Sequence, residues 1–236
     1  MIIAAALCPA PPLLIPGLTG AAGSVLPELR HACEQAVAEL VAAEPDVVAV
    51  VGIGEQTATW DGDARLDVAV FAPGIGTARH PASGLPASLP ASLGVGGWLL
   101  DQAGYAGERL LHSLAHSESA ERCAHIGADL AAGPGRTALL VLADGSACRN
   151  HNAPGYFDER SAGFDAEVER AVRTGDVAAL LAIDAGLASE LLATGRPGWQ
   201  VLAGALPGVR LTTEIWYCDD PFGVAYLVAS LRTFTD

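Results

Sequence analysis

Chemically active side chains gather in one short stretch of this chain. It reads DGSACRNHNAPGYFD and begins at Asp144. His151 titrates near neutral pH and could transfer protons together with Asp144. Arg149 could hold a carboxylate or phosphate through paired hydrogen bonds, with Ser146 and Tyr156 beside it. The alternative is that these polar groups only cap turns and that Arg149 pairs with an aspartate.

A second polar stretch, Gly52–Asp63, offers Glu55 as a general base or as a metal ligand. Its Asp61-Gly62-Asp63 resembles part of a calcium loop, but the other acidic positions are missing, which favours a turn. His112 and His116 have the spacing that a helix would turn into a metal-binding pair. The sequence around them favours a strand, in which four residues span about 13 Å and cannot share one ion.

The elements that must position these groups alternate between strand and helix. That pattern predicts an α/β fold with a mostly parallel central sheet and helices on both faces, in a single domain over residues 1–236. The expected strands are Ile2–Cys8, Val47–Val51, Leu66–Phe71, Arg109–Ala115, Thr137–Leu142, Arg210–Tyr217 and Gly223–Arg232. The expected helices are Ser24–Ala43, Leu93–Ala103, Ser117–Ala132, Ala166–Arg173 with Asp165 as its cap, Val177–Ile183, Ala185–Ala193 and Trp199–Ala205.

Ligands of such sheets bind at the carboxyl ends of the strands. The loops that should gather there are Cys8–Pro16, Gly52–Asp63, Ala143–Asp158 and Cys218–Gly223. The sequence therefore predicts a pocket at this edge, lined by the polar groups named above.

Several segments along the chain carry a family resemblance. They are Cys8-Pro-Ala10-Pro11-Pro12, Val48-Ala-Val-Val-Gly52-Ile53-Gly54, Leu140-Val-Leu-Ala-Asp144-Gly-Ser146-Ala147, Phe164-Asp165 and Ala193-Thr194-Gly195-Arg196. In order and spacing they resemble the class III extradiol dioxygenase (LigB-like) and Memo superfamily. The resemblance implies a LigB/Memo-like fold and places Pro11, Thr194 and Arg196 at the ligand site.

The same resemblance implies functional side chains that this chain lacks. Metal-binding histidines are expected at Ala10 and at Ile53–Gly54, an acid/base histidine at Ala147, and a cysteine at the metal position occupied by Thr194. Alanine, isoleucine and glycine side chains have no lone pair to give a metal. We therefore expect no cofactor and no metal ligands. The alternative is iron or zinc held by other residues, such as Glu55, His80 and His151.

Composition restricts the partners. The net charge is −14, from 27 acidic and 13 basic residues, and every basic residue is arginine. An acidic chain without lysine is a poor match for nucleic acid or for an anionic membrane. Five scattered cysteines without CxxC spacing, and an apolar start without a basic region, indicate a cytoplasmic protein. Because the chain is apolar, with a mean hydropathy of +0.35, a homodimer is expected.

Together these features predict a LigB/Memo-like protein that binds a small, anionic molecule without metal. It is either a binder or a repurposed enzyme that uses Asp144 and His151. Two alternatives stay open: a metal-dependent extradiol-type dioxygenase with non-standard ligands, and a non-catalytic interaction protein that keeps only the fold.

Overall fold

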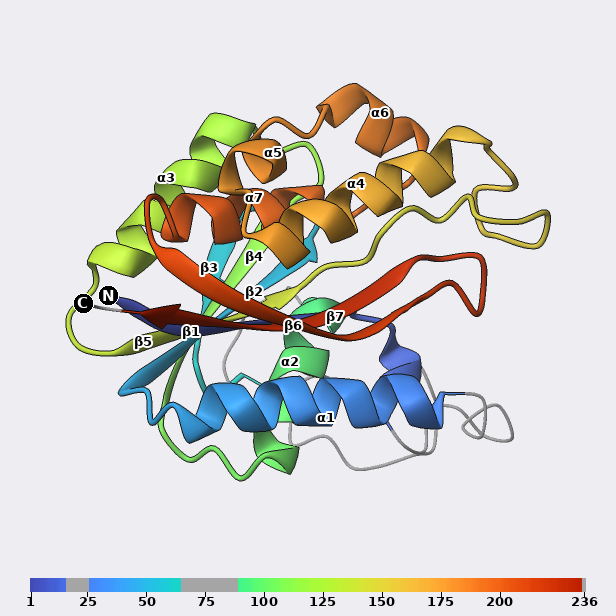
Figure 1. The fold of residues 1–236 in the computed structure, drawn as a ribbon. Coiled ribbons are helices and arrows are strands. Elements are labelled where there is room, and N and C mark those ends of the chain that lie inside the picture. Colours follow the sequence, from blue (N-terminus) through green and yellow to red (C-terminus); the bar gives the residue numbers. More distant parts are fainter. Residues whose placement is uncertain (16–25, 65–88, 235–236) are drawn as a thin grey trace.

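One seven-stranded sheet crosses the molecule, with helices on both sides (Figure 1). The computed structural model describes residues 1–15, 26–64 and 89–234, so the expected strand Leu66–Phe71 lies outside the described residues. The strands are β1 (Ile2–Cys8), β2 (Val47–Gly54), β3 (Ala58–Trp60), β4 (Glu108–Ala115), β5 (Thr137–Leu142), β6 (Arg210–Asp219) and β7 (Tyr226–Phe234). The helices are η1 (Pro12–Leu14), α1 (Pro27–Ala42), α2 (Ala91–Gln102), α3 (Ala120–Ala132), α4 (Arg160–Thr174), α5 (Val177–Leu181), α6 (Ala185–Glu190) and α7 (Arg196–Ala205).

The central strands are apolar along their whole length because both of their faces are covered. In β5, Leu139 and Val141 belong to the hydrophobic core on the side of α3 to α7. Ala138, Leu140 and Leu142 belong to the core on the side of α1 and α2. Successive side chains of a strand point to opposite faces of the sheet, so one continuous apolar run contributes side chains to both cores.

The sheet is mixed, which corrects the expectation of a mostly parallel one. In the order β3-β4-β2-β5-β1-β7-β6, the four strands from β4 to β1 are parallel to one another. The outer strands β3, β7 and β6 run antiparallel to their neighbours. The short connection from Asp220 to Ala225 joins β6 to β7 as a hairpin, and a connection this short permits only antiparallel pairing. The α/β class itself is confirmed.

Helix α4 begins earlier than the sequence indicated. It starts at Arg160, so Asp165 lies inside the helix and does not cap it. Its carboxylate instead accepts two hydrogen bonds from Ser146, at 2.9 Å from the backbone N and 2.5 Å from Oγ. Helix α3 begins at Ala120, three residues later than predicted, and Ser119 caps it by accepting a hydrogen bond from the backbone N–H of Arg122.

Helix α7 is buried throughout and lies between α3 and the sheet. Its start at Arg196 is three residues earlier than predicted. Among the described residues, no helix combines the length and apolarity needed to cross a membrane.

Candidate functional site

Three segments far apart in sequence meet at the carboxyl edge of the parallel strands. Ala10 follows β1, and Asp144 follows β5. The backbone N–H of Ala10 donates a hydrogen bond to Asp144 Oδ1 at 2.8 Å. The backbone N–H of Gly195, at the start of α7, donates to the Asp144 carbonyl at 2.9 Å. A Cβ at position 195 would lie 2.5 Å from that carbonyl oxygen, so this close approach requires glycine.

Asp144 is half-buried at this meeting point. Loss of water around the carboxylate raises its pKa to about 6, although the hydrogen bond from Ala10 acts in the opposite direction. Oδ2 has no hydrogen-bond partner among the described residues. Burial, and next the negative charge of Asp144, raise the pKa of the Tyr226 hydroxyl. Asp144 can therefore exchange a proton near neutral pH.

Ser146 and Arg149 belong to an ion-pair network. Ser146 is fully buried and bound to Asp165, so its hydroxyl is not available to a ligand. Arg149 Nε donates to Asp220 Oδ2 at 2.8 Å, and Nη1 lies 3.8 Å from Asp165 Oδ2. The expectation of an uncommitted Arg149 is therefore wrong, and the alternative of an arginine paired with aspartate is correct.

Arg149 does line a cavity, of about 190 Å³, between α4 and the β6–β7 hairpin. Four carboxylates share this lining with it: Asp165, Glu169, Asp219 and Asp220. Because the carboxylates outnumber the single guanidinium, this cavity does not favour an anionic ligand.

His151 and Tyr156 lie apart from Asp144 on an exposed loop. The His151 ring lies 5.2 Å from the ring centres of both Tyr156 and Phe157. Tyr156 is 62% exposed and Phe157 47% exposed. These three residues form an exposed aromatic cluster rather than the wall of an enclosed pocket.

The remaining predicted ligand-binding residues differ in their surroundings. Pro11 is buried and precedes η1, while Glu55 is exposed in the bend after β2. Thr194 and Arg196 line a cavity of about 580 Å³ where β4 ends and α7 begins. Of these four residues, Thr194 and Arg196 are brought together in one cavity.

Arg196 is held in that cavity by neutral groups. Nη1 donates to Gln200 Oε1 at 2.7 Å, and Nη2 donates to the carbonyls of His116 at 2.8 Å and Glu118 at 2.7 Å. Gln200 is oriented in turn by its own amide, which donates to the carbonyls of Leu181 and Ile183. The sequence did not predict Gln200, because the carbonyls that orient it, at Leu181 and Ile183, are 19 and 17 residues away.

At the positions where the sequence resemblance implied metal ligands, the residues present do not fit a metal. Ala10 contributes only its backbone N–H, Gly54 packs where a Cβ would touch Pro90 at 3.0 Å, and Ala147 is buried. Across residues 1–15, 26–64 and 89–234, no cluster of three or more His, Cys, Asp or Glu could bind a metal ion. His80, one of the alternative ligands, lies outside the described residues.

Two further sequence hypotheses concern histidine and cysteine pairs. His112 lies within β4 and His116 follows it, as the strand prediction required, and burial lowers the pKa of His112. Cys8 and Cys33 lie in the same core beneath α1, where Cys8 and burial raise the pKa of the Cys33 thiol. Cys148 lies in the core on the opposite face, so Cys8 and Cys148 do not form a site.

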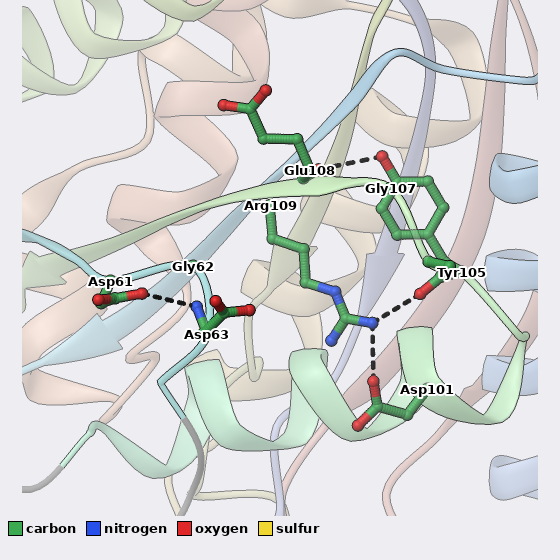
Figure 2. A pocket seen from close by; sticks show the side chains of 9 residues that line it. Asp61, Gly62, Asp63, Asp101, Tyr105, Gly107, Glu108 and Arg109 are labelled. Carbon is green, nitrogen blue, oxygen red and sulfur yellow. Dashed lines mark hydrogen bonds and ion pairs between the residues drawn. The ribbon is translucent and has the colours of Figure 1, made fainter. Parts of the chain in front are cut away.

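A polar cavity of about 570 Å³ lies at the opposite end of β4 (Figure 2). Arg109 points into it but is already engaged, with Asp101 at 2.7 Å and the Tyr105 carbonyl at 2.7 Å. Asp61 accepts from the backbone N–H of Asp63, which makes this pair the predicted turn. This cavity lies at the amino end of β4 and shares no residue with the carboxyl edge.

The comparisons with known proteins bear on the fold. No protein-family model matches the chain, and none of the curated proteins matches it. Among solved structures, the chain is similar to an uncharacterized protein, JW3007, from Escherichia coli K12, with a TM-score of 0.52 and 15% identity. The match covers 98% of this chain and 99% of that one. At this identity, the similarity shows a shared α/β fold and nothing about activity.

Proposed function

We propose that this chain is a divergent LigB/Memo-like protein that binds a small molecule at the carboxyl edge of its parallel strands without a metal. Asp144 is its proton-transferring group. The main support is the environment of Asp144, a carboxyl with a pKa of about 6, fixed through Oδ1 while Oδ2 lacks a partner among the described residues. A carboxyl of this kind can act as general acid or base near neutral pH.

The sequence resemblance supports the same proposal. The segments that carry it, around Ala10, Asp144 and Gly195, contact one another although they come from widely separated parts of the chain. The resemblance implies metal ligands at this edge of the sheet. Here the residues supply a proton donor or acceptor and a buried arginine, Arg196, instead of metal ligands.

The proposal is tested on the unliganded protein. In carbon-13 NMR, the Asp144 carboxyl should titrate with a pKa of about 6, and the signal should be absent from Asp144→Asn. Protein purified without chelator should contain far less than one iron or zinc per chain. One bound transition metal per chain, lost on mutation of Glu55 or His151, would contradict the proposal in favour of a metal-dependent dioxygenase.

Catechol should remain intact in the presence of ferrous iron, because ring cleavage needs a metal with open positions for substrate and oxygen. Oxygen consumption coupled to a yellow ring-fission product would show that the metal chemistry is retained. Ala10→His alone should not create tight metal binding, since one imidazole is far from a complete ligand set.

A non-catalytic interaction protein is the second candidate. The exposed aromatic cluster of His151, Tyr156 and Phe157 favours it, because contiguous exposed aromatic side chains are frequent at protein interfaces. Under this alternative, Asp144→Asn would leave every ligand response of the protein unchanged, whereas the leading proposal requires a change.

A further inference from the structure

We infer that the cavity beside Arg196 is a binding site for the carboxylate or phosphate group of a small organic anion. This cavity, the Arg196 pocket, is lined on its polar side by His116, Ser117, Ser189, Thr194 and Arg196. The inference deepens the proposed small-molecule function, on which it rests, by naming the class of ligand. Its argument uses the charge of Arg196 and not the proton chemistry of Asp144.

The first support is a buried positive charge with no counter-charge. Arg196 is 3% exposed, and no carboxylate in the described part of the chain forms an ion pair with it. Its three hydrogen bonds go to one amide oxygen and two backbone carbonyls, all neutral. An isolated buried charge is strongly unfavourable, so an anion from solution would offset a large part of that free energy.

The nearby carboxylates are engaged elsewhere. Glu118 presents its carbonyl to Arg196, while its carboxylate accepts hydrogen bonds from Thr57 Oγ1 at 2.5 Å and from the Ser119 backbone N–H at 3.1 Å. Asp184 accepts from the Leu187 N–H at the start of α6. Neither carboxylate forms an ion pair with the guanidinium of Arg196.

The lining of the Arg196 pocket contains no acidic residue. In a chain with 27 acidic residues, this distinguishes the pocket from the cavity at Arg149, which has four carboxylates in its lining. Carboxylates at short range would repel an anion. Because none lines this pocket, the positive charge of Arg196 determines the electrostatic potential inside it.

The start of helix α7 adds a second positive field. Ala193, Thr194 and Arg196 line the cavity, and the ten-residue helix Arg196–Ala205 begins there. The amino end of a helix carries a partial positive charge that favours anions. The dipole of α7 therefore adds to the field of Arg196, while the backbone N–H groups of Gly195 and Arg196 are bonded to the carbonyls of Asp144 and Ala193.

The size of the pocket indicates more than an inorganic ion. Its volume is about 580 Å³, and Ala188, Leu192 and Ala193 give it an apolar wall. An anionic group at Arg196 leaves this wall for a hydrocarbon portion of the same molecule. The structure therefore assigns a ligand with one anionic end and one apolar end.

The test uses hexyl phosphate and hexanoate as probes, with hexanol as the uncharged control, in calorimetry and thermal shift at constant ionic strength. Both anions should bind and raise the melting temperature, and hexanol should not. Arg196→Gln should weaken anion binding by about tenfold or more. Inorganic phosphate is added as a third probe, and it should bind more weakly because it lacks the apolar end.

A pair of variants with the same added charge tests the pocket without touching Arg196. Ser189→Glu places a carboxylate on the exposed rim and should also weaken binding by about tenfold. Ala128→Glu adds the same charge at an exposed position of α3 outside the pocket and should leave binding within about twofold. Ser189→Glu decides the question if Arg196→Gln fails to fold.

The inference is wrong if neither anion binds, or if binding survives both Arg196→Gln and Ser189→Glu. Equal binding of hexanol would show an apolar site rather than an anion site. The Asp144 titration is measured on the unliganded protein and does not depend on anion binding. If no anion binds, the inference about the Arg196 pocket is wrong, but the titration still tests the proposed role of Asp144.

Discussion

Asp144 holds its proton more tightly in the folded protein than an aspartate does in water, because desolvation of the carboxylate raises its pKa from 3.8 to about 6. Between about pH 4 and pH 6 the native state therefore binds more protons than the unfolded chain, and the free energy of unfolding falls as pH rises through this window. Below about pH 4 Asp144 is protonated in both the folded and the unfolded protein, so it no longer changes the free energy of unfolding.

We expect Asp144→Asn to remove this dependence. Asparagine Oδ1 can still accept from the Ala10 N–H, so the variant and the natural protein should be similarly stable at pH 4. At pH 7 the variant should be more stable by roughly 2–3 kcal/mol. Urea unfolding at several pH values measures the difference, and a difference that does not change with pH would contradict the raised pKa.

Arg149 is expected to stabilise the unliganded protein. Arg149→Ala leaves Asp165, whose side chain is 14% exposed, without its neighbouring cation, and should lower the free energy of unfolding by about 1–3 kcal/mol. Arg160→Ala is the matched control, because the Arg160 side chain is 50% exposed in its ion pairs and its loss should matter less. Equal losses in the two variants in urea unfolding would refute the structural role of Arg149.

At the scale of elements, close packing of α3 against α7 depends on two glycines. A Cβ at Gly204 would lie 2.3 Å from the Ala124 carbonyl oxygen, and one at Gly127 would lie 2.2 Å from the Val201 carbonyl oxygen. Both contacts are with backbone, which cannot move aside as a flexible side chain can. The helices approach closely because neither residue has a side chain.

Gly204→Ala should therefore lower the free energy of unfolding by about 1–3 kcal/mol, the usual range for overpacking. Gly163→Ala in α4 is the control, because nothing lies within 4 Å of its Cβ position. That variant should gain about 0.5–1 kcal/mol from the reduced flexibility of the unfolded chain. Thermal unfolding of both proteins measures the contrast, and a tolerated Gly204→Ala would mean that α3 and α7 separate at little cost.

The elements that the sequence predicted well are those with long, continuous patterns. The apolar runs of β2 and β5 identified buried strands, and helical periodicity identified α3, whose end at Ala132 was predicted correctly. Strand β3 was missed because three residues are too few for a periodic pattern. Strands β6 and β7 were predicted, but their antiparallel direction was not, because periodicity gives the length of a strand and not its direction.

The site was harder to predict because its contacts are distant in sequence. Asp165 looked like a helix cap because its partner, Ser146, is 19 residues away, and Arg149 looked free because Asp220 is 71 residues away. Arg196 and Thr194 were selected by family resemblance alone. Nothing in the local sequence shows that Arg196 would be buried with neutral partners.

At the scale of the whole molecule, the exposed aromatic cluster adjoins a further apolar side chain. Leu192 is 44% exposed, and its Cδ1 lies 2.8 Å from the position that a Cβ would take at Gly155, next to Tyr156. Tyr156 and Leu192 both have positive φ, of 63° and 53°, which is unfavourable for side chains of this size. Apolar surface of this kind is stabilised when a partner covers it.

We expect a two-fold homodimer in which this surface is covered. Light scattering should give twice the chain mass of 24.0 kDa at high protein concentration. Phe157→Ser should shift the equilibrium toward monomer, because it removes apolar area from the interface. Phe234→Ser, which changes a 54% exposed phenylalanine at the end of β7, should leave the mass unchanged. A monomeric mass at all concentrations would refute the dimer. A dimer that Phe157→Ser does not weaken would place the interface elsewhere and leave the aromatic cluster free for another protein.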